Sequence, residues 1–152
     1  MTGTLPAWEK AAARAFVLLV AIIAVAACHR PPDEDEVREA IASAVSAARA
    51  NDSAGVLAVV SDDFIGNDGA MDRDGLRKLL VLRALRHDKT GVVTGPVTLE
   101  RNGDRIIAKF KLVLTGGKPG DLLPADTTLH AMTTAWRHDG GHWRCYNATW
   151  SQ

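Results

Sequence analysis

The spacing of apolar residues along the chain changes from a helical pattern to an alternating one. Between residues 33 and 89, apart from a brief extended piece predicted at 63–67, apolar side chains recur every three or four positions, as in helices with one buried face. From Gly91 onward, apolar and polar positions alternate, as in strands with one buried face. Turns such as Asn102–Gly103 separate the alternating segments. The pattern therefore predicts an α+β domain in which helices come first and an antiparallel sheet follows.

Three helices are predicted ahead of the alternating region. The first covers 33–49, where Val37, Ile41 and Val45 recur at helical spacing. A second, short helix is expected around Val56, and a third after the N-cap residue Asp72. The third helix carries the apolar residues Leu76, Leu79, Leu80, Leu82 and Leu85. Its outer, solvated side is expected to be marked by the basic residues Arg77, Lys78, Arg83, Arg86 and Lys89.

Four main strands are predicted in the second half of the chain. The first is a single long strand that places Val93, Val97 and Leu99 on one face. The others are expected around Phe110, over 127–137 and over 142–150, with glycine-rich turns between them.

The N-terminal segment has the order of features found in a secretory signal. Lys10 and Arg14 precede an apolar run from Ala15 to Ala27. This run is shorter than the ~20 apolar residues that a membrane-spanning helix needs. Residues 1–27 are therefore predicted to be a signal peptide.

The end of this segment, Val25-Ala26-Ala27-Cys28, resembles the lipobox of bacterial lipoproteins. The resemblance implies that Cys28 is acylated, with chains such as palmitate, and anchors the protein in a lipid bilayer. Residues 28–32 would then form a short tether. Because His29, and not an aspartate, follows the cysteine, the resemblance favours the periplasmic face of the outer membrane over the inner membrane.

Charge and cysteine content narrow the classes of partner. Eighteen basic residues balance eighteen acidic ones, so no nucleic-acid partner is expected. If Cys28 is acylated, Cys145 has no partner within the chain. The aromatic neighbours of Cys145 favour a buried, unreactive thiol, with an intermolecular bridge or a reactive thiol as the alternative.

Three segments together resemble the nuclear transport factor two-like superfamily, which includes SnoaL-like cyclases and ketosteroid isomerases. They are Ser61–Gly66, Asp72–Leu76 and the closing hairpin from Trp136 to Arg144, which leads on to Trp150. The resemblance covers residues 33–152. It implies a cone of three N-terminal helices packed on a curved antiparallel sheet, an apolar pocket inside the cone, and homodimers formed through the sheet face.

A pocket of this kind would be lined by residues of the central and last strands. His130, Met132 and Trp136 share one parity of their strand and are expected to face inward. Asn147 and Trp150 have opposite parities, so both can face inward only across a β-bulge. The full set of predicted pocket residues is Phe110, His130, Met132, Trp136, Tyr146, Asn147 and Trp150.

The sequence contains few candidate catalytic or metal-binding residues. His130 could serve as an acid or base near neutral pH, and Asp63 as a general base at the pocket mouth. Ketosteroid isomerases use a carboxylate with a tyrosine and an acid, whereas here the only tyrosine, Tyr146, lies on the last strand. His138 and His142 flank a Gly-Gly turn, so no metal site is predicted, and no cofactor motif is present.

The sequence therefore favours a membrane-anchored periplasmic lipoprotein with a non-catalytic role, which binds a small apolar ligand or a periplasmic protein. The alternative is an enzyme of the SnoaL or ketosteroid-isomerase type that uses His130 and Asp63 as its acid–base residues.

Overall fold

The computed structural model describes residues 32–86, 89–117 and 126–152. The chain divides into two compact units, Met1–Pro32 and Asp33–Gln152. The predicted signal peptide and Cys28 lie outside the described residues, as does the tether apart from Pro32. In the part of the chain that is described, no helix is both long enough and apolar enough to cross a membrane.

The three predicted helices are present and are labelled α2 (Pro32–Arg49), α3 (Ser53–Ala58) and α4 (Arg73–Arg86). Two of them begin at an aspartate cap, which satisfies a backbone N–H that the first turn leaves unpaired. Asp52 Oδ1 accepts a hydrogen bond from the Gly55 N–H at 3.0 Å, and Asp72 Oδ1 accepts one from the Gly75 N–H at 2.7 Å. The sequence prediction of Asp72 as an N-cap is therefore confirmed.

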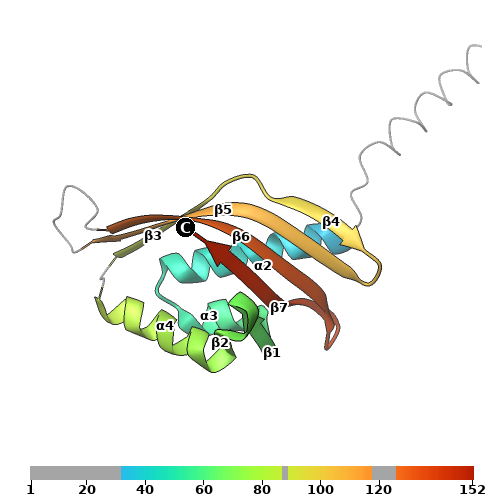
Figure 1. The fold of residues 1–152 in the computed structure, drawn as a ribbon, viewed down its shortest axis with the longest axis horizontal. Helices are drawn as coiled ribbons and strands as arrows, with labels where there is room; N and C mark the ends of the chain where they lie inside the picture. Colours follow the sequence, from blue (N-terminus) through green and yellow to red (C-terminus); the bar gives the residue numbers. More distant parts are fainter. Residues whose placement is uncertain (1–31, 87–88, 118–125) are drawn as a thin grey trace, which may run out of the picture. The chain divides into compact units, whose positions relative to one another are not determined.

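One curved, unclosed sheet contains all the strands (Figure 1). Its strand order is β2-β1-β7-β6-β5-β3, and β4 pairs with β5 beside β3. Neighbouring strands are antiparallel except for β1 and β7, which are parallel, a pairing that the hairpin pattern did not predict. The strands are β1 (Val60–Gly66), β2 (Met71–Asp72), β3 (Lys89–Thr94), β4 (Thr98–Asn102), β5 (Arg105–Gly117), β6 (Asp126–Asp139) and β7 (His142–Ser151).

The single long strand predicted around Val97 is wrong, because the structure divides it into β3 and β4. Both pieces pair with β5, β3 with its end and β4 with its beginning. Pro96 lies in the gap between them, and proline has no N–H to donate to a sheet.

The hydrophobic core lies between α2 and the face of the sheet on which the three helices lie (Figure 1). Val37 and Ile41 of α2 are buried there with Phe64, Ile106 and Trp136 from the strands. The β6–β7 hairpin is joined to α2 at Trp143, whose N–H donates to Glu36 Oε1 and whose Nε1–H donates to Asp33 Oδ1, both at 3.2 Å. Because these core contacts all fall within Asp33–Gln152, this unit is expected to fold on its own.

Candidate functional site: an apolar cavity between the helices and the sheet

A cavity of about 520 Å³ lies between the three helices and the inner face of the sheet. Strands β5, β6 and β7 cross this face, and their register aligns inward-facing residues in rows across the sheet. From the closed end to the open end, the rows are Ile106–Trp136–Cys145, Ala108–Thr134–Ala148, Phe110–Met132–Trp150, Leu112–His130 and Leu114–Thr128.

Exposure shows which end of the cavity is open. In the first row, Trp136 is only 3% exposed, whereas His130 and Thr128 in the last rows are partly exposed. Leu79 of α4 also lines the cavity and is 47% exposed. The mouth therefore lies beside α4, and the floor lies at Trp136.

The polar groups of the floor have partners within the protein. Trp136 Nε1–H donates to Thr134 Oγ1 at 2.8 Å, and the Thr134 hydroxyl donates to the Ala108 carbonyl at 3.5 Å. The Cys145 thiol donates to the Asn147 carbonyl at 3.3 Å. Burial raises the pKa of this thiol to about 12, so the structure bears out the buried position that its aromatic neighbours indicated.

Nearer the mouth, two polar atoms lack hydrogen-bond partners among the described residues. His130 Nε2 lies 3.2 Å from Thr128 Oγ1, but its other ring nitrogen, Nδ1, is shielded from solvent and has no hydrogen-bond partner among the described residues. Arg83 Nε on α4 is shielded and unpartnered in the same way. Both residues line the cavity, so its open half contains polar atoms whose hydrogen bonds are not made within the described protein.

Five of the seven predicted pocket residues line the cavity, namely Phe110, His130, Met132, Trp136 and Trp150. The structure does not place Tyr146 and Asn147 among the lining residues. Tyr146 follows the inward-facing Cys145, so alternation alone turns it to the other face. Asn147 is excluded by a bulge in β7, where the pairing with β6 passes from Trp136↔Cys145 to Ala135↔Asn147 and leaves Tyr146 as the extra residue. Beyond the bulge, Ala148 and Trp150 face the cavity.

Tyr146 belongs to a cluster of polar residues on the other face of the sheet. Its hydroxyl accepts a hydrogen bond from Arg105 at 3.4 Å, and the Arg137 guanidinium lies 5.1 Å from its ring centroid. Because Tyr146 makes these contacts away from the cavity, it cannot hold the oxygen of a ligand bound inside.

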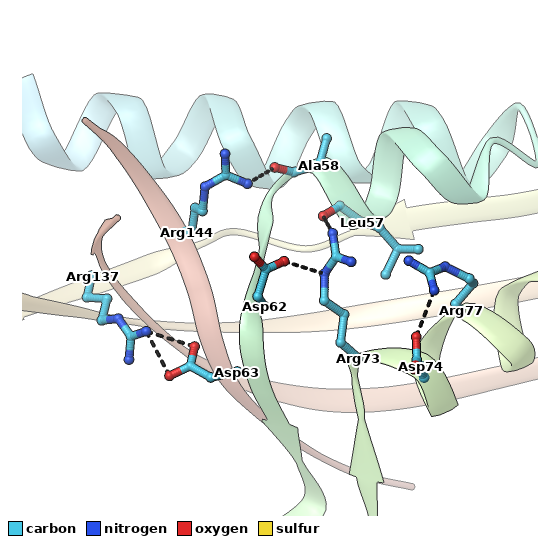
Figure 2. A network of polar contacts seen from close by, with 9 residues as sticks. All are labelled: Leu57, Ala58, Asp62, Asp63, Arg73, Asp74, Arg77, Arg137 and Arg144. Atoms are coloured by element: carbon cyan, nitrogen blue, oxygen red, sulfur yellow. Dashed lines mark hydrogen bonds and ion pairs between the residues drawn. The ribbon is translucent and has the colours of Figure 1, made fainter. Parts of the chain in front are cut away.

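Asp63 also lies outside the cavity. Its two carboxylate oxygens accept hydrogen bonds from Arg137 at 2.7 and 2.8 Å, as Figure 2 shows, and the side chain is 62% exposed. The hydrogen bonds from Arg137 lower the pKa of this carboxyl below its ordinary value. His130 and Asp63, the predicted acid–base pair, are therefore not brought together in one site.

Arg83 is the lining residue that the sequence prediction placed wrongly, on the outer side of the third helix. It lies seven residues after Leu76 and three after Leu80, and both leucines line the cavity. Residues at this spacing share one face of a helix. The spacing thus indicated that Arg83 faces inward, although its charge favoured an exposed position.

The two turn histidines each approach one acidic residue of α2. His138 Nε2 is 3.6 Å from Asp33 Oδ1, and His142 Nδ1 is 3.6 Å from Glu36 Oε1. Within the described ranges, no three side chains of the types that hold metal ions are grouped together.

Solved structures with a similar fold include several NTF2-like proteins. An NTF2-like protein of unknown function from Pseudomonas putida has a TM-score of 0.66 and 20% identity, over 80% of this chain and 87% of that chain. A candidate scytalone dehydratase from Novosphingobium aromaticivorans has a TM-score of 0.67 and 11% identity, over 77% and 81%. From the same organism, an NTF2-like protein with a cystatin-like fold has a TM-score of 0.64 and 21% identity, over 97% and 90%.

No family model matches the chain, and no curated protein matches its sequence. The structural likeness shows the fold, a mixed α+β arrangement of the NTF2-like and SnoaL-like kind, in which three helices lie against a curved sheet. Because this fold occurs both in candidate dehydratases and in proteins of unknown function, the function has to be argued from the cavity.

Proposed function

We propose that the protein is a lipid-anchored envelope protein that binds a small apolar ligand in its cavity without transforming it. The observation that carries this proposal is the cavity itself. Its volume of about 520 Å³ is within the usual range for small-molecule sites, and its wall consists mainly of aliphatic and aromatic side chains. Asp52 is the one carboxylate among the described lining residues, and it is engaged as the cap of α3. Within the described ranges, no free carboxylate therefore lines the cavity opposite His130.

Binding in the cavity can be tested with the unit Asp33–Gln152 and the neutral fluorescent probe N-phenyl-1-naphthylamine. Met132 is at the centre of the cavity wall, whereas its neighbour Thr133 is exposed and is not a lining residue. We expect wild type and Thr133→Trp to bind the probe, and Met132→Trp to lose at least tenfold in affinity because the larger ring occupies the cavity. Equal binding by the two tryptophan variants, or none by wild type, would contradict the proposal.

The proposed anchor rests on Val25–Cys28 and on the charged and apolar segments before it. The full chain, expressed in a Gram-negative host, is expected to fractionate with outer membranes and to yield an N-terminal Cys28 peptide that carries acyl chains. Cys28→Ala is expected to remove the acyl mass. If the mass of the wild-type N-terminal peptide corresponds to an unmodified Cys28, the lipoprotein proposal is wrong.

We propose a second copy of the chain as a partner at the outer face of the sheet. The pairing register aligns Val93, Val113 and Leu129 in one row across β3, β5 and β6. Val93 is 58% exposed and Leu129 is 52% exposed, so this row presents apolar surface to solvent. Burying such surface between two copies would stabilise a dimer.

A second candidate function is an enzyme of the SnoaL or dehydratase type, favoured by the unpartnered Nδ1 of His130 in the cavity. In that case His130 would act as acid or base without Asp63, which is paired with Arg137 outside the cavity. Its test is turnover by wild type that His130→Gln abolishes while probe binding is retained.

A further inference from the structure

We propose that the ligand is a single-chain amphiphile with a carboxylate head, such as a fatty acid, whose head is bound by Arg83 and His130. This inference rests on the proposed function, because it requires that the cavity binds a ligand. It adds the chemical class of that ligand and its orientation, with the head at the mouth and the chain toward Trp136.

Arg83 provides the positive charge. An arginine guanidinium carries a permanent positive charge. Arg83 lines the cavity, and its Nε–H has neither solvent nor a hydrogen-bond partner in the described part of the chain. A shielded donor on a permanent cation is stabilised best by an anionic oxygen.

His130 provides a second polar atom from the opposite wall. When the Thr128 hydroxyl donates to Nε2, the imidazole carries its proton on Nδ1, which is the shielded and unpartnered nitrogen. Nδ1–H is then a donor within the cavity. A carboxylate has two acceptor oxygens, so one head group can accept from both walls.

The chain topology places these two residues at the same end of the domain. Arg83 is one turn before the end of α4 at Arg86, and two residues link α4 to the first residue of β3. The beginning of β3 pairs with the end of β5, and the beginning of β6 pairs with that same end. His130 lies near the beginning of β6, opposite Leu112 of β5. Both donors therefore belong to the open half of the cavity.

The rest of the cavity favours a hydrocarbon chain. Beyond His130, the wall continues with Met132, Phe110 and Trp150 and ends at Trp136. The floor hydroxyl and indole N–H bond to protein acceptors, so they require no polar group from a ligand. A ligand with one anionic end and an apolar remainder therefore matches the cavity at both ends, whereas a neutral hydrocarbon leaves the Arg83 Nε–H without an acceptor.

The test compares three ligands of equal chain length, dodecanoate, dodecanol and dodecylamine, as competitors of N-phenyl-1-naphthylamine on Asp33–Gln152. We expect dodecanoate to displace the probe at a concentration at least tenfold lower than dodecanol, and dodecylamine to be the weakest. Arg83→Met should abolish the preference for the acid over the alcohol. Arg86→Met removes an exposed charge from the same helix and should behave as wild type. Arg83→Gln provides a second variant, and thermal melting checks that each variant is folded.

The outcomes separate the two proposals. If wild type binds the probe but acid and alcohol compete equally, or if Arg83→Met and Arg83→Gln keep the preference for acid, the carboxylate inference is overturned and the apolar cavity stands. If wild type does not bind the probe, the proposed function fails and the inference fails with it.

Discussion

Replacing Thr134 by valine tests whether the floor of the cavity is stabilised by a hydrogen bond inside the protein. Thr134 is 6% exposed, and its hydroxyl accepts from Trp136 Nε1–H at 2.8 Å. Valine keeps the branched shape but has no acceptor, so the indole N–H would remain buried without a partner. An unsatisfied buried polar group costs about 1–3 kcal/mol. We therefore expect Thr134→Val to lower the free energy of unfolding by about 2 kcal/mol.

The assay is urea denaturation of Asp33–Gln152, followed by tryptophan fluorescence and circular dichroism. With a urea dependence of about 2 kcal/mol per molar, a loss of about 2 kcal/mol moves the midpoint down by about 1 M. Thr133→Val is the matched control, because Thr133 is the next residue on β6 and is exposed. Its effect should stay within about 0.5 kcal/mol of wild type.

A double-mutant cycle identifies the interaction itself. In a Trp136→Phe background the indole donor is absent, so Thr134→Val should cost less than it does in wild type, with a coupling of about 1–2 kcal/mol. Zero coupling, or equal midpoints for the two threonine variants, would show that this hydrogen bond does not stabilise the floor.

Three further predictions concern other parts of the domain. The lowered pKa of Asp63 means that its ion pair stabilises the fold above the ordinary aspartate pKa of 3.8 and that this contribution is lost as pH falls through the folded value. In thermal melting, Asp63→Asn should therefore be less stable than wild type at pH 7 and approach it in acid. A difference that does not depend on pH would refute the argument. Because burial raises the pKa of Cys145, this thiol should resist iodoacetamide at pH 8 in the folded protein and react in urea. Mass spectrometry measures the labelling, and rapid labelling of the folded protein would contradict the burial of Cys145. Leu129→Glu should convert a dimer into a monomer in analytical ultracentrifugation, whereas Leu85→Glu, at an exposed leucine of α4, should not; a monomeric wild type would exclude the second copy as partner.

Strand periodicity predicted the inner face of β6 because that strand is regular along its pairing with β5. Twelve consecutive residues of β6, from Asp126 to Arg137, pair with β5 without a shift. Alternation therefore holds throughout, and His130, Met132 and Trp136 all reach the cavity wall as their parity indicated.

The same reasoning failed in β7, where one extra residue changes which face each side chain occupies. The sequence showed that Asn147 and Trp150 could share a face only across a bulge. The bulge exists, but it lies at Tyr146, ahead of both residues. Its position depends on pairing with β6 and with β1, where the register also shifts, and neither is readable from β7 alone.

Contacts between distant segments were also beyond the sequence pattern. Asp33 is in the first turn of α2, where an acidic residue is explained by the helix dipole alone. In the structure its carboxylate accepts from Arg101 of β4 at 2.7 Å as well as from Trp143 of β7. Local spacing carries no information on such pairs, because they form only after the helix has packed on the sheet.

The distribution of hydrogen bonds along the cavity gives a reason for ligand orientation. At the floor, the buried polar groups of Trp136 and Thr134 bond to protein, so a polar head placed there would find no free donor and would lose its hydration. Near the mouth, Arg83 and His130 hold shielded polar atoms without protein partners, so a head placed there gains hydrogen bonds. The two orientations of an amphiphile in the cavity therefore differ in binding free energy, whereas a neutral hydrocarbon has no polar head that would favour one end. This asymmetry favours one orientation, in which the head can exchange with solvent beside α4 while the chain remains buried.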